Sequence, residues 1–231
     1  MKNKVSLILL LWGFIVSVFS QTQNIQLSIV PSFGTQTLHL ADSAFYSNDS
    51  NALQIHLLKF YISHIQLLKN GHVVLEEKNS FHLLDANQVQ SCRIDIENPH
   101  NIVFDELKFN LGIDSETNVS GAMGGDLDPT KGMYWTWQSG YINFKLEGSS
   151  KLCHTKNNEF QFHLGGYQQP YDCLQTLSFP ILNSENIILK LDIQSILNQM
   201  DLMHTHHIMS PGIEAAMLSK IIASSFTISD H

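Results

Sequence analysis

The stretch that decides the fold runs from Leu57 to Leu75 and reads LLKFYISHIQLLKNGHVVL. Two runs rich in apolar and β-branched residues are separated there by the dipeptide Asn70-Gly71. Asn-Gly readily adopts the positive φ angles of a two-residue type I′ turn. The stretch therefore predicts a β-hairpin with strands over 57–69 and 72–75.

Short runs in which apolar and other residues alternate surround this hairpin along the chain. Glycine, asparagine, aspartate and proline separate the runs, and period two is typical of half-buried strands. The clearest groups are Ile25, Leu27 and Ile29; Phe109 and Leu111; Phe160 and Phe162; and Ile187, Leu189 and Leu191. About ten strands at this spacing predict an all-β, immunoglobulin-like sandwich of two sheets.

Two segments depart from the alternating pattern. Residues 114–132 are rich in glycine and polar side chains, which predicts a long loop of the kind found beside functional sites. Near the end of the chain a short helix is expected, with Ser210 as its N-cap and Pro211 at its first position. The face expected to pack on the sandwich consists of Ile213, Met217, Ile221 and Ser224.

The first twenty residues have the pattern of a secretory signal peptide: two lysines, an apolar run over 5–18, and Ser20 before the expected cleavage point. An uncleaved membrane anchor is the alternative, but the run is shorter than the roughly 20 residues of a membrane span. We therefore expect residues 21–231 to form one exported domain, in the periplasm or at the cell surface, with no transmembrane segment after cleavage.

The net charge of the chain limits the kinds of partner that it is expected to bind. Without Lys2 and Lys4 the 13 basic residues become 11, against 21 acidic residues, so the formal net charge falls from −8 to −10. Such an acidic chain is not expected to bind nucleic acid.

Three cysteines follow the expected cleavage point. Cys153 and Cys173 flank a predicted strand and could close a disulfide loop of roughly 20 residues. Cys92 would then be unpaired, and its alternation with Ile94 and Ile96 predicts a buried, inert thiol.

The densest group of histidines and methionines lies at 200–209. It contains His204, His206 and His207, flanked by Met203 and Met209. Imidazole nitrogen and thioether sulfur together suit copper. A solvated connection leading into the last helix is the alternative interpretation, because the spacing matches no fixed metal-binding motif.

Four segments together resemble the MbnP-like family of exported proteins, the protein half of so-called metallo-mystery pairs. The resemblance runs from about 25 to 226. Its segments are Phe60-Tyr61-Ile62-Ser63, Asn118-Val119-Ser120-Gly121, Met133 to Tyr141 with its two tryptophans, and Phe162-His163-Leu164-Gly165-Gly166.

The resemblance implies copper binding through histidines, for storage, uptake or handover of the metal. It makes His163 a ligand candidate beside the 204–207 group. A structural histidine that is hydrogen-bonded to a loop carbonyl is the alternative for His163. In some relatives a diheme cytochrome-type oxidase converts a tryptophan near the metal to kynurenine, so Trp135 and Trp137 are the candidates for modification. Two residues apart, their rings are expected to share one face of a strand. A place in the core is the alternative for both.

The chain also departs from the better-known copper-binding members. It has no histidine over 114–132, where those members often carry an Asn-His step, and it has three cysteines instead of four. A non-metal interaction module at the cell surface or in the periplasm is therefore the alternative function. Carboxylates at Asp114, Glu116, Asp126 and Asp128 leave calcium as a further possibility. The sequence contains no GxSxG, P-loop or GxGxxG motif, and no enzymatic activity is expected.

Overall fold

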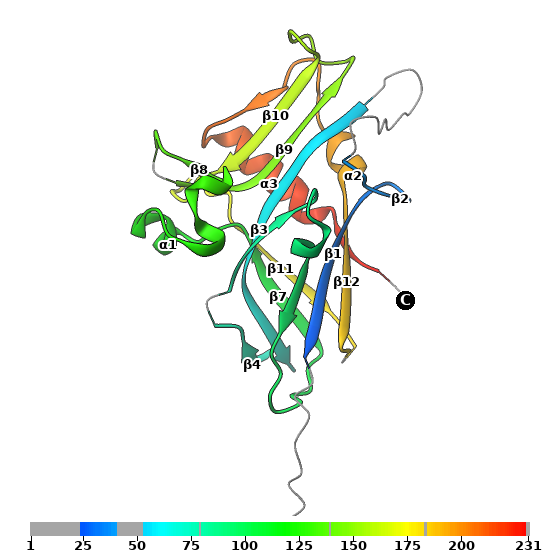
Figure 1. Cartoon of the computed structure of the whole chain (residues 1–231), viewed down its shortest axis with the longest axis vertical. Helices are drawn as coiled ribbons and strands as arrows, with labels where there is room; N and C mark the ends of the chain where they lie inside the picture. Colours follow the sequence, from blue (N-terminus) through cyan, green and yellow to red (C-terminus); the bar gives the residue numbers. More distant parts are fainter. Residues whose placement is uncertain (1–23, 41–52, 79, 139, 183, 230–231) are drawn as a thin grey trace, which may run out of the picture.

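A computed structural model describes residues 24–40, 53–78, 80–138, 140–182 and 184–229. The proposed signal peptide lies outside these residues. The strands form two β-sheets. In Figure 1, β1 and β12 of the smaller sheet lie next to β3, β7 and β11 of the larger sheet. The predicted all-β sandwich is confirmed.

Within the described residues the smaller sheet has the order β14-β12-β1-β2, with β6 also paired to β1. Its strands are β1 (Ile25–Phe33), β2 (Gln36–Thr37), β6 (Arg93–Ile96), β12 (Asn186–Asp192) and β14 (Phe226–Ile228). Strands β1 and β12 run parallel, with Leu27 opposite Ile187 and Ile29 opposite Leu189. These alternating residues are buried, as their period of two predicts.

The larger sheet has the order β11-β7-β3-β9-β10-β13, with β4 and β5 paired to β3 and β8 paired to β9. Its strands are β3 (Leu53–Lys69), β4 (His72–Glu76), β5 (Phe81–Asp85), β7 (Glu106–Leu111), β8 (Tyr134–Trp135), β9 (Gly140–Ser150), β10 (Glu159–Gly165), β11 (Gln175–Pro180) and β13 (His207–Ile208). Strands β2 and β13, which the sequence pattern does not indicate, have two residues each, too few to show a period. The strand expected around the two tryptophans is present only as the two residues of β8.

The predicted hairpin is present as β3 and β4. Lys69 pairs with His72, so Asn70 and Gly71 form a two-residue turn. Their φ angles are +50° and +76°, the signs that a type I′ turn requires.

Three helices occur in the described residues: α1 (Ser115–Ser120), α2 (Ile193–Leu197) and α3 (Ile213–Ser224). The loop predicted over 114–132 contains α1 and two short 3-10 turns, η2 (Gly125–Leu127) and η3 (Pro129–Lys131). Figure 1 shows α1 standing out from the side of the larger sheet, close to β8.

The predicted start of the last helix is wrong. Helix α3 begins at Ile213, with Gly212 as its N-cap and no side chain capping it. Pro211 instead packs on the connection after β10, since a Cβ added to Gly166 would lie 3.1 Å from the Cβ of Pro211. Gly212 is extended, with φ 175° and ψ 178°, so Pro211 lies outside the helix.

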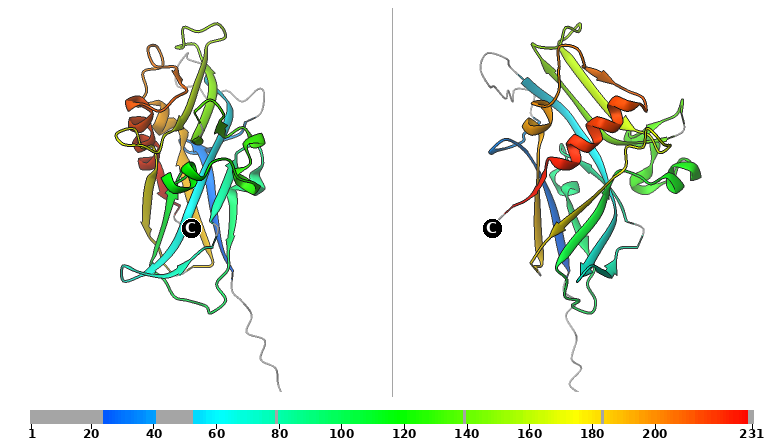
Figure 2. Two further views of the ribbon diagram at one scale, coloured as in Figure 1. Left: turned by 90° about the vertical axis from the view of Figure 1, so that its left-hand side faces the viewer. Right: turned by 180° about the vertical axis from the view of Figure 1, so that it is seen from behind.

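The predicted buried face of α3 is also wrong. Ile213 is 61% exposed and Met217 is 59% exposed. The buried residues are Ala215, Ala216, Leu218, Ser219 and Ile222. Small side chains let the helix approach β10 and β11, which it contacts while lying across the back of the molecule (Figure 2). The buried face therefore combines small residues with the larger Leu218 and Ile222.

The predicted disulfide between Cys153 and Cys173 is absent, and all three cysteines are buried free thiols. The two residues flank β10 as expected, but at its opposite ends. The backbone of Cys153 bonds to Ser150 at the end of β9, and that of Cys173 bonds to Gly166 after β10. Seven extended residues span about 20 Å, whereas a disulfide needs Cα atoms about 4.4–6.8 Å apart. Cys92 is buried as predicted.

Candidate metal centre at the edge of the larger sheet

The two tryptophans meet at the start of β9. Strand β8 pairs with β9, placing Trp135 opposite Gly140. The ring centroids of Trp135 and Trp137 are 5.9 Å apart, so the two rings are close, but they do not share one face of a strand as predicted. The strand ends at Trp135, and Trp137 lies in a turn. Trp135 is 6% exposed and Trp137 is 65% exposed, so only Trp135 belongs to the interior.

Trp135 lies over the end of β10. A Cβ added to Gly165 would stand 2.7 Å from the indole Cζ3 and 2.5 Å from the backbone oxygen of Tyr141. Only the absence of a side chain at Gly165 leaves room for the indole. The indole of Trp135 therefore lies against Gly165, which follows His163 by two residues in β10.

His163 faces away from the core. Phe160, Phe162 and Leu164 of the same strand join the main hydrophobic core, and His163 alternates with them. The His163 side chain is 8% exposed, and its Nε2 lies 2.7 Å from Oε1 of Glu147 on β9. This hydrogen bond lowers the pKa of Glu147; burial acts in the opposite direction, and nearby Lys145 adds to the lowering.

Glu147 belongs to a polar row that ties the sheet to the glycine-rich segment. Lys145 Nζ lies 3.7 Å from the same carboxylate and donates to the backbone oxygen of Gly132 at 3.2 Å. Sequence reasoning did not single out Glu147. Its alternation with Lys145 indicates an outer face, but only strand pairing shows that His163 is its neighbour.

The histidine segment at 204–207 joins the same sheet edge. Strand β13 runs parallel to β10, with Gln161 opposite His207 and Phe162 opposite Ile208. Paired residues share a face, so His207 lies on the face that also carries Gln161 and His163. Such diagonal neighbours have Cα atoms about 7–8 Å apart.

His206 and His207 adjoin each other at this edge. Their ring centroids are 5.1 Å apart. Nδ1 of His206 is buried and has no hydrogen-bond partner among the described residues. A buried polar nitrogen without a partner is costly, so a ligand at this atom would be stabilising. Met209 follows β13 and is 44% exposed.

The remaining predicted ligands are placed differently. Nδ1 of His204 lies 2.7 Å from Oδ2 of Asp201, and the His204 side chain is 79% exposed. Met203, in the same turn, is 46% exposed. In the part of the chain that the structure describes, no three His, Cys, Asp or Glu side chains are grouped so as to hold a metal ion. The predicted set is therefore divided, with His163, His206, His207 and Met209 at one sheet edge.

The glycine-rich segment is anchored over a second, smaller core. Tyr61 OH donates to the backbone oxygen of Asp126 at 3.0 Å, and Tyr141 OH lies 3.1 Å from that of Leu127. Burial raises the pKa of Tyr61, so its hydroxyl remains a donor. The core consists of Tyr61, Leu83, Ile113, Leu127, Met133, Trp135, Tyr141 and Ile142.

Asn118, one residue of the segments that carry the resemblance, has a structural role. Its Oδ1 accepts from the backbone N–H of Tyr141 at 2.8 Å, and its Nδ2 donates to the backbone oxygens of Ile113 and Asp114. It therefore joins α1 to the start of β9.

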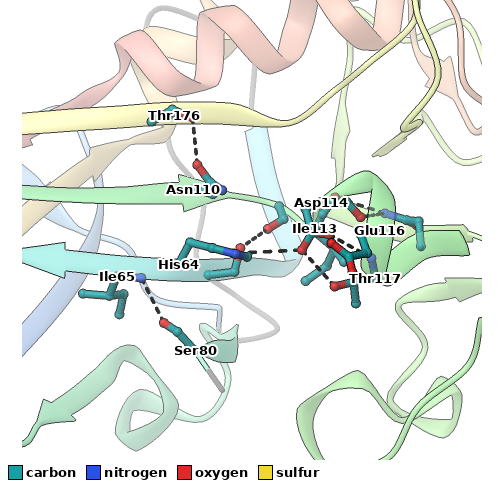
Figure 3. Close-up of polar contacts among 12 residues, drawn as sticks. His64, Ile65, Ser80, Asn110, Ile113, Asp114, Glu116, Thr117 and Thr176 are labelled. Atoms are coloured by element: carbon teal, nitrogen blue, oxygen red, sulfur yellow. Dashed lines mark hydrogen bonds and ion pairs between the residues drawn. The ribbon is translucent and has the colours of Figure 1, made fainter. Parts of the chain in front are cut away.

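The carboxylates considered for calcium bond to protein donors. Asp114 caps α1 through Thr117 and lies 4.0 Å from Nδ1 of His64 (Figure 3). Asp126 pairs with Lys131 at 2.5 Å. The described residues show no calcium-type cluster.

His64 stands on an irregularity of β3. The pairing of β3 with β7 shifts between Ser63 and Gln66, and His64 has a φ angle of +51°. Figure 3 shows its ring directed toward Asp114, at the base of α1. The sequence offered no signal for this contact.

The protein is a two-sheet β-sandwich with histidines at the β10–β13 edge of its larger sheet. The sequence profile of the MbnP family matches residues 22–211. The chain therefore belongs to the MbnP family, and the resemblance seen in the sequence is confirmed.

The fold is similar to that of a solved structure, MbnP from Methylosinus trichosporium. The TM-score is 0.58 and the sequence identity 14%, over 79% of this chain and 80% of the other. Comparison with curated proteins gives no match. No helix among the described residues is long and apolar enough to cross a membrane.

Proposed function

We propose that this chain is an exported, non-catalytic protein that binds copper for storage, uptake or handover. The observation that carries the proposal is the parallel pairing of β13 with β10, which puts His207 opposite Gln161 and on the face that also carries His163. His206 and Met209 flank this position in the chain. The parallel pairing of β10 with β13 is the feature of the fold that brings residues near 163 and 207 to the same edge.

The donor set suits copper. Imidazole nitrogen and thioether sulfur are copper ligands, with the thioether favouring Cu(I). A metal-ligating histidine commonly bonds through its other nitrogen to a carboxylate, and the His163–Glu147 pair has this form. His206 offers a buried nitrogen that has no other partner among the described residues. Exposed His207 and Met209 have the freedom to turn toward the metal.

The location of the protein and its partner are part of the same proposal. Residues 1–20 support export to the periplasm or cell surface. A diheme oxidase would act on Trp135 or Trp137. We favour Trp137 as its target, because this side chain is 65% exposed and therefore accessible to a partner protein. A metal bound at this edge would lie on the outer face of β10, two residues from the glycine beneath Trp135.

Copper analysis of matched variants tests the proposed site. The wild-type chain is expected to bind about one copper ion. His163→Ala and the double variant His206→Ala/His207→Ala are expected to lose it, whereas His204→Ala is expected to keep it, because His204 is bonded to Asp201. Each variant is checked by circular dichroism for an unchanged fold.

Three results would contradict the proposal in different ways. Loss of copper in His204→Ala alone would place the metal on the exposed turn. Retention in both of the other variants would remove the β10–β13 edge as the site. If the wild-type chain takes up neither Cu(I) nor Cu(II), the interaction-module function is favoured. Intact-mass spectrometry of protein from its native envelope separately shows whether a tryptophan is converted to kynurenine.

A further inference from the structure

The chain contains one arginine, Arg93, among thirteen basic residues. Arg93 is the first residue of β6, and its side chain is exposed. Within the described ranges its guanidinium makes no hydrogen bond and no ion pair. Arginine differs from lysine in presenting a rigid, planar fork of donors that matches a carboxylate in a bidentate manner. Because Arg93 is the one arginine in the sequence, we consider the surface around it.

Arg93 lines a polar pocket of about 470 Å³, within the size range of small-molecule sites. The pocket lies between β5, the start of β6 and the glycine-rich segment. It is separate from the β10–β13 edge, and none of the candidate copper ligands lines it. Its lining residues include Lys59, Lys131, His82, Gln88 and Asp85.

The other cations of the pocket are already held in place by acids. Lys59 Nζ lies 3.1 Å from Asp85, and Lys131 Nζ lies 2.5 Å from Asp126. Asp126 also accepts a hydrogen bond from the backbone N–H of Leu83, which fixes it to the edge of β5. These pairs leave the charge of Arg93 uncompensated, in a protein whose overall charge is strongly negative.

We propose that this pocket binds a small organic polycarboxylate. One carboxylate would pair with the guanidinium of Arg93 on one wall. A second would accept from the ammonium groups of Lys59 and Lys131, which each retain hydrogens beyond those used in their ion pairs. Asp85 and Asp126 also line the pocket, paired with Lys59 and Lys131. This inference is independent of the proposed copper function.

Calorimetric titration of the metal-free chain with citrate tests the proposal. Saturable binding at one site is expected for the wild type. Arg93→Gln is expected to weaken the affinity by about tenfold or more, as loss of a charge-assisted bidentate pair predicts. Arg93→Lys should fall between the two. Lys156→Gln, which removes one exposed charge from the connection between β9 and β10, serves as the matched control and should bind as the wild type does.

Acetate and inorganic phosphate are titrated in parallel. Weak binding of both, beside tighter citrate binding, supports a site that reads two separated carboxylates. Equal or tighter binding of phosphate would overturn the polycarboxylate assignment. Citrate binding that is absent in the wild type, or unchanged in Arg93→Gln, would overturn the site itself.

Discussion

At the scale of single residues, a hydrogen bond joins the side chains of His163 and Glu147. His163 is nearly buried, yet it lies on the outer face of β10 and bonds to a carboxylate at 2.7 Å. A carboxylate partner fixes the orientation of an imidazole ring. The pair is also a source of stability, because hydrogen bonds to charged groups are stronger than neutral ones.

Replacing Glu147 tests that contribution. The pKa of Glu147 is lowered in the folded state, chiefly by the hydrogen bond from His163. Its stabilisation is therefore present above the unfolded-state value, about 4.3, and is lost as the pH falls through the lower folded-state value. Glu147→Gln should lower the free energy of unfolding at pH 7 by roughly 1–2 kcal/mol. Urea denaturation at pH 7 and in steps below pH 4.5 should show the difference shrinking.

Glu76→Gln is the control, because Glu76 is exposed on β4 and no ion pair joins it to the described residues. This change should leave the stability within about 0.5 kcal/mol of the wild type at either pH. A Glu147→Gln effect that did not vary with pH would show that packing, and not the charge, stabilises the pair.

At the scale of elements, the short strands β13 and β8 position His207 and Trp135. Strand β13 has two residues, and its pairing with β10 places His207 opposite Gln161. Strand β8 has two residues and brings Trp135 against β9. Neither strand is long enough to show a period in the sequence. The candidate site therefore depends on elements that pattern reasoning detects poorly.

Helix α3 carries a direct test of which face is buried. Leu218 is 2% exposed and Met217 is 59% exposed. Leu218→Ala should destabilise the fold by about 2–5 kcal/mol, because it opens a cavity against the sandwich. Met217→Ala should change the stability by less than about 0.5 kcal/mol. Thermal or urea denaturation distinguishes the two variants, and the reverse order would restore the face predicted from the sequence.

At the scale of the whole molecule, the length of strand β10 separates two cysteines that look paired in the sequence. Cys153 and Cys173 lie at opposite ends of β10, and the structure leaves Cys92, Cys153 and Cys173 as buried thiols. Burial raises the pKa of all three, to about 11 for Cys173. Thiols with a raised pKa contain little thiolate near neutral pH and react slowly.

Alkylation without a reducing agent follows from this arrangement. The native chain at pH 8 should take up little iodoacetamide, and the chain unfolded in guanidinium should take up three equivalents, one for each free cysteine. Mass spectrometry counts the labels. A single label on the unfolded chain, rising to three after reduction, would show that a disulfide forms after all.

The sequence by itself determined the sandwich, the β3–β4 turn at Asn70 and Gly71, the buried Cys92 and the family. These features depend on alternation, turn chemistry and motif segments, which are local in the chain. Tertiary structure alone decided the buried face of α3, the thiol state of Cys153 and Cys173, and the pairing of β13 with β10 that puts His207 opposite Gln161. The physical reason is that strand pairing and helix packing join residues far apart in the chain, and register, which local sequence does not specify, selects the neighbours.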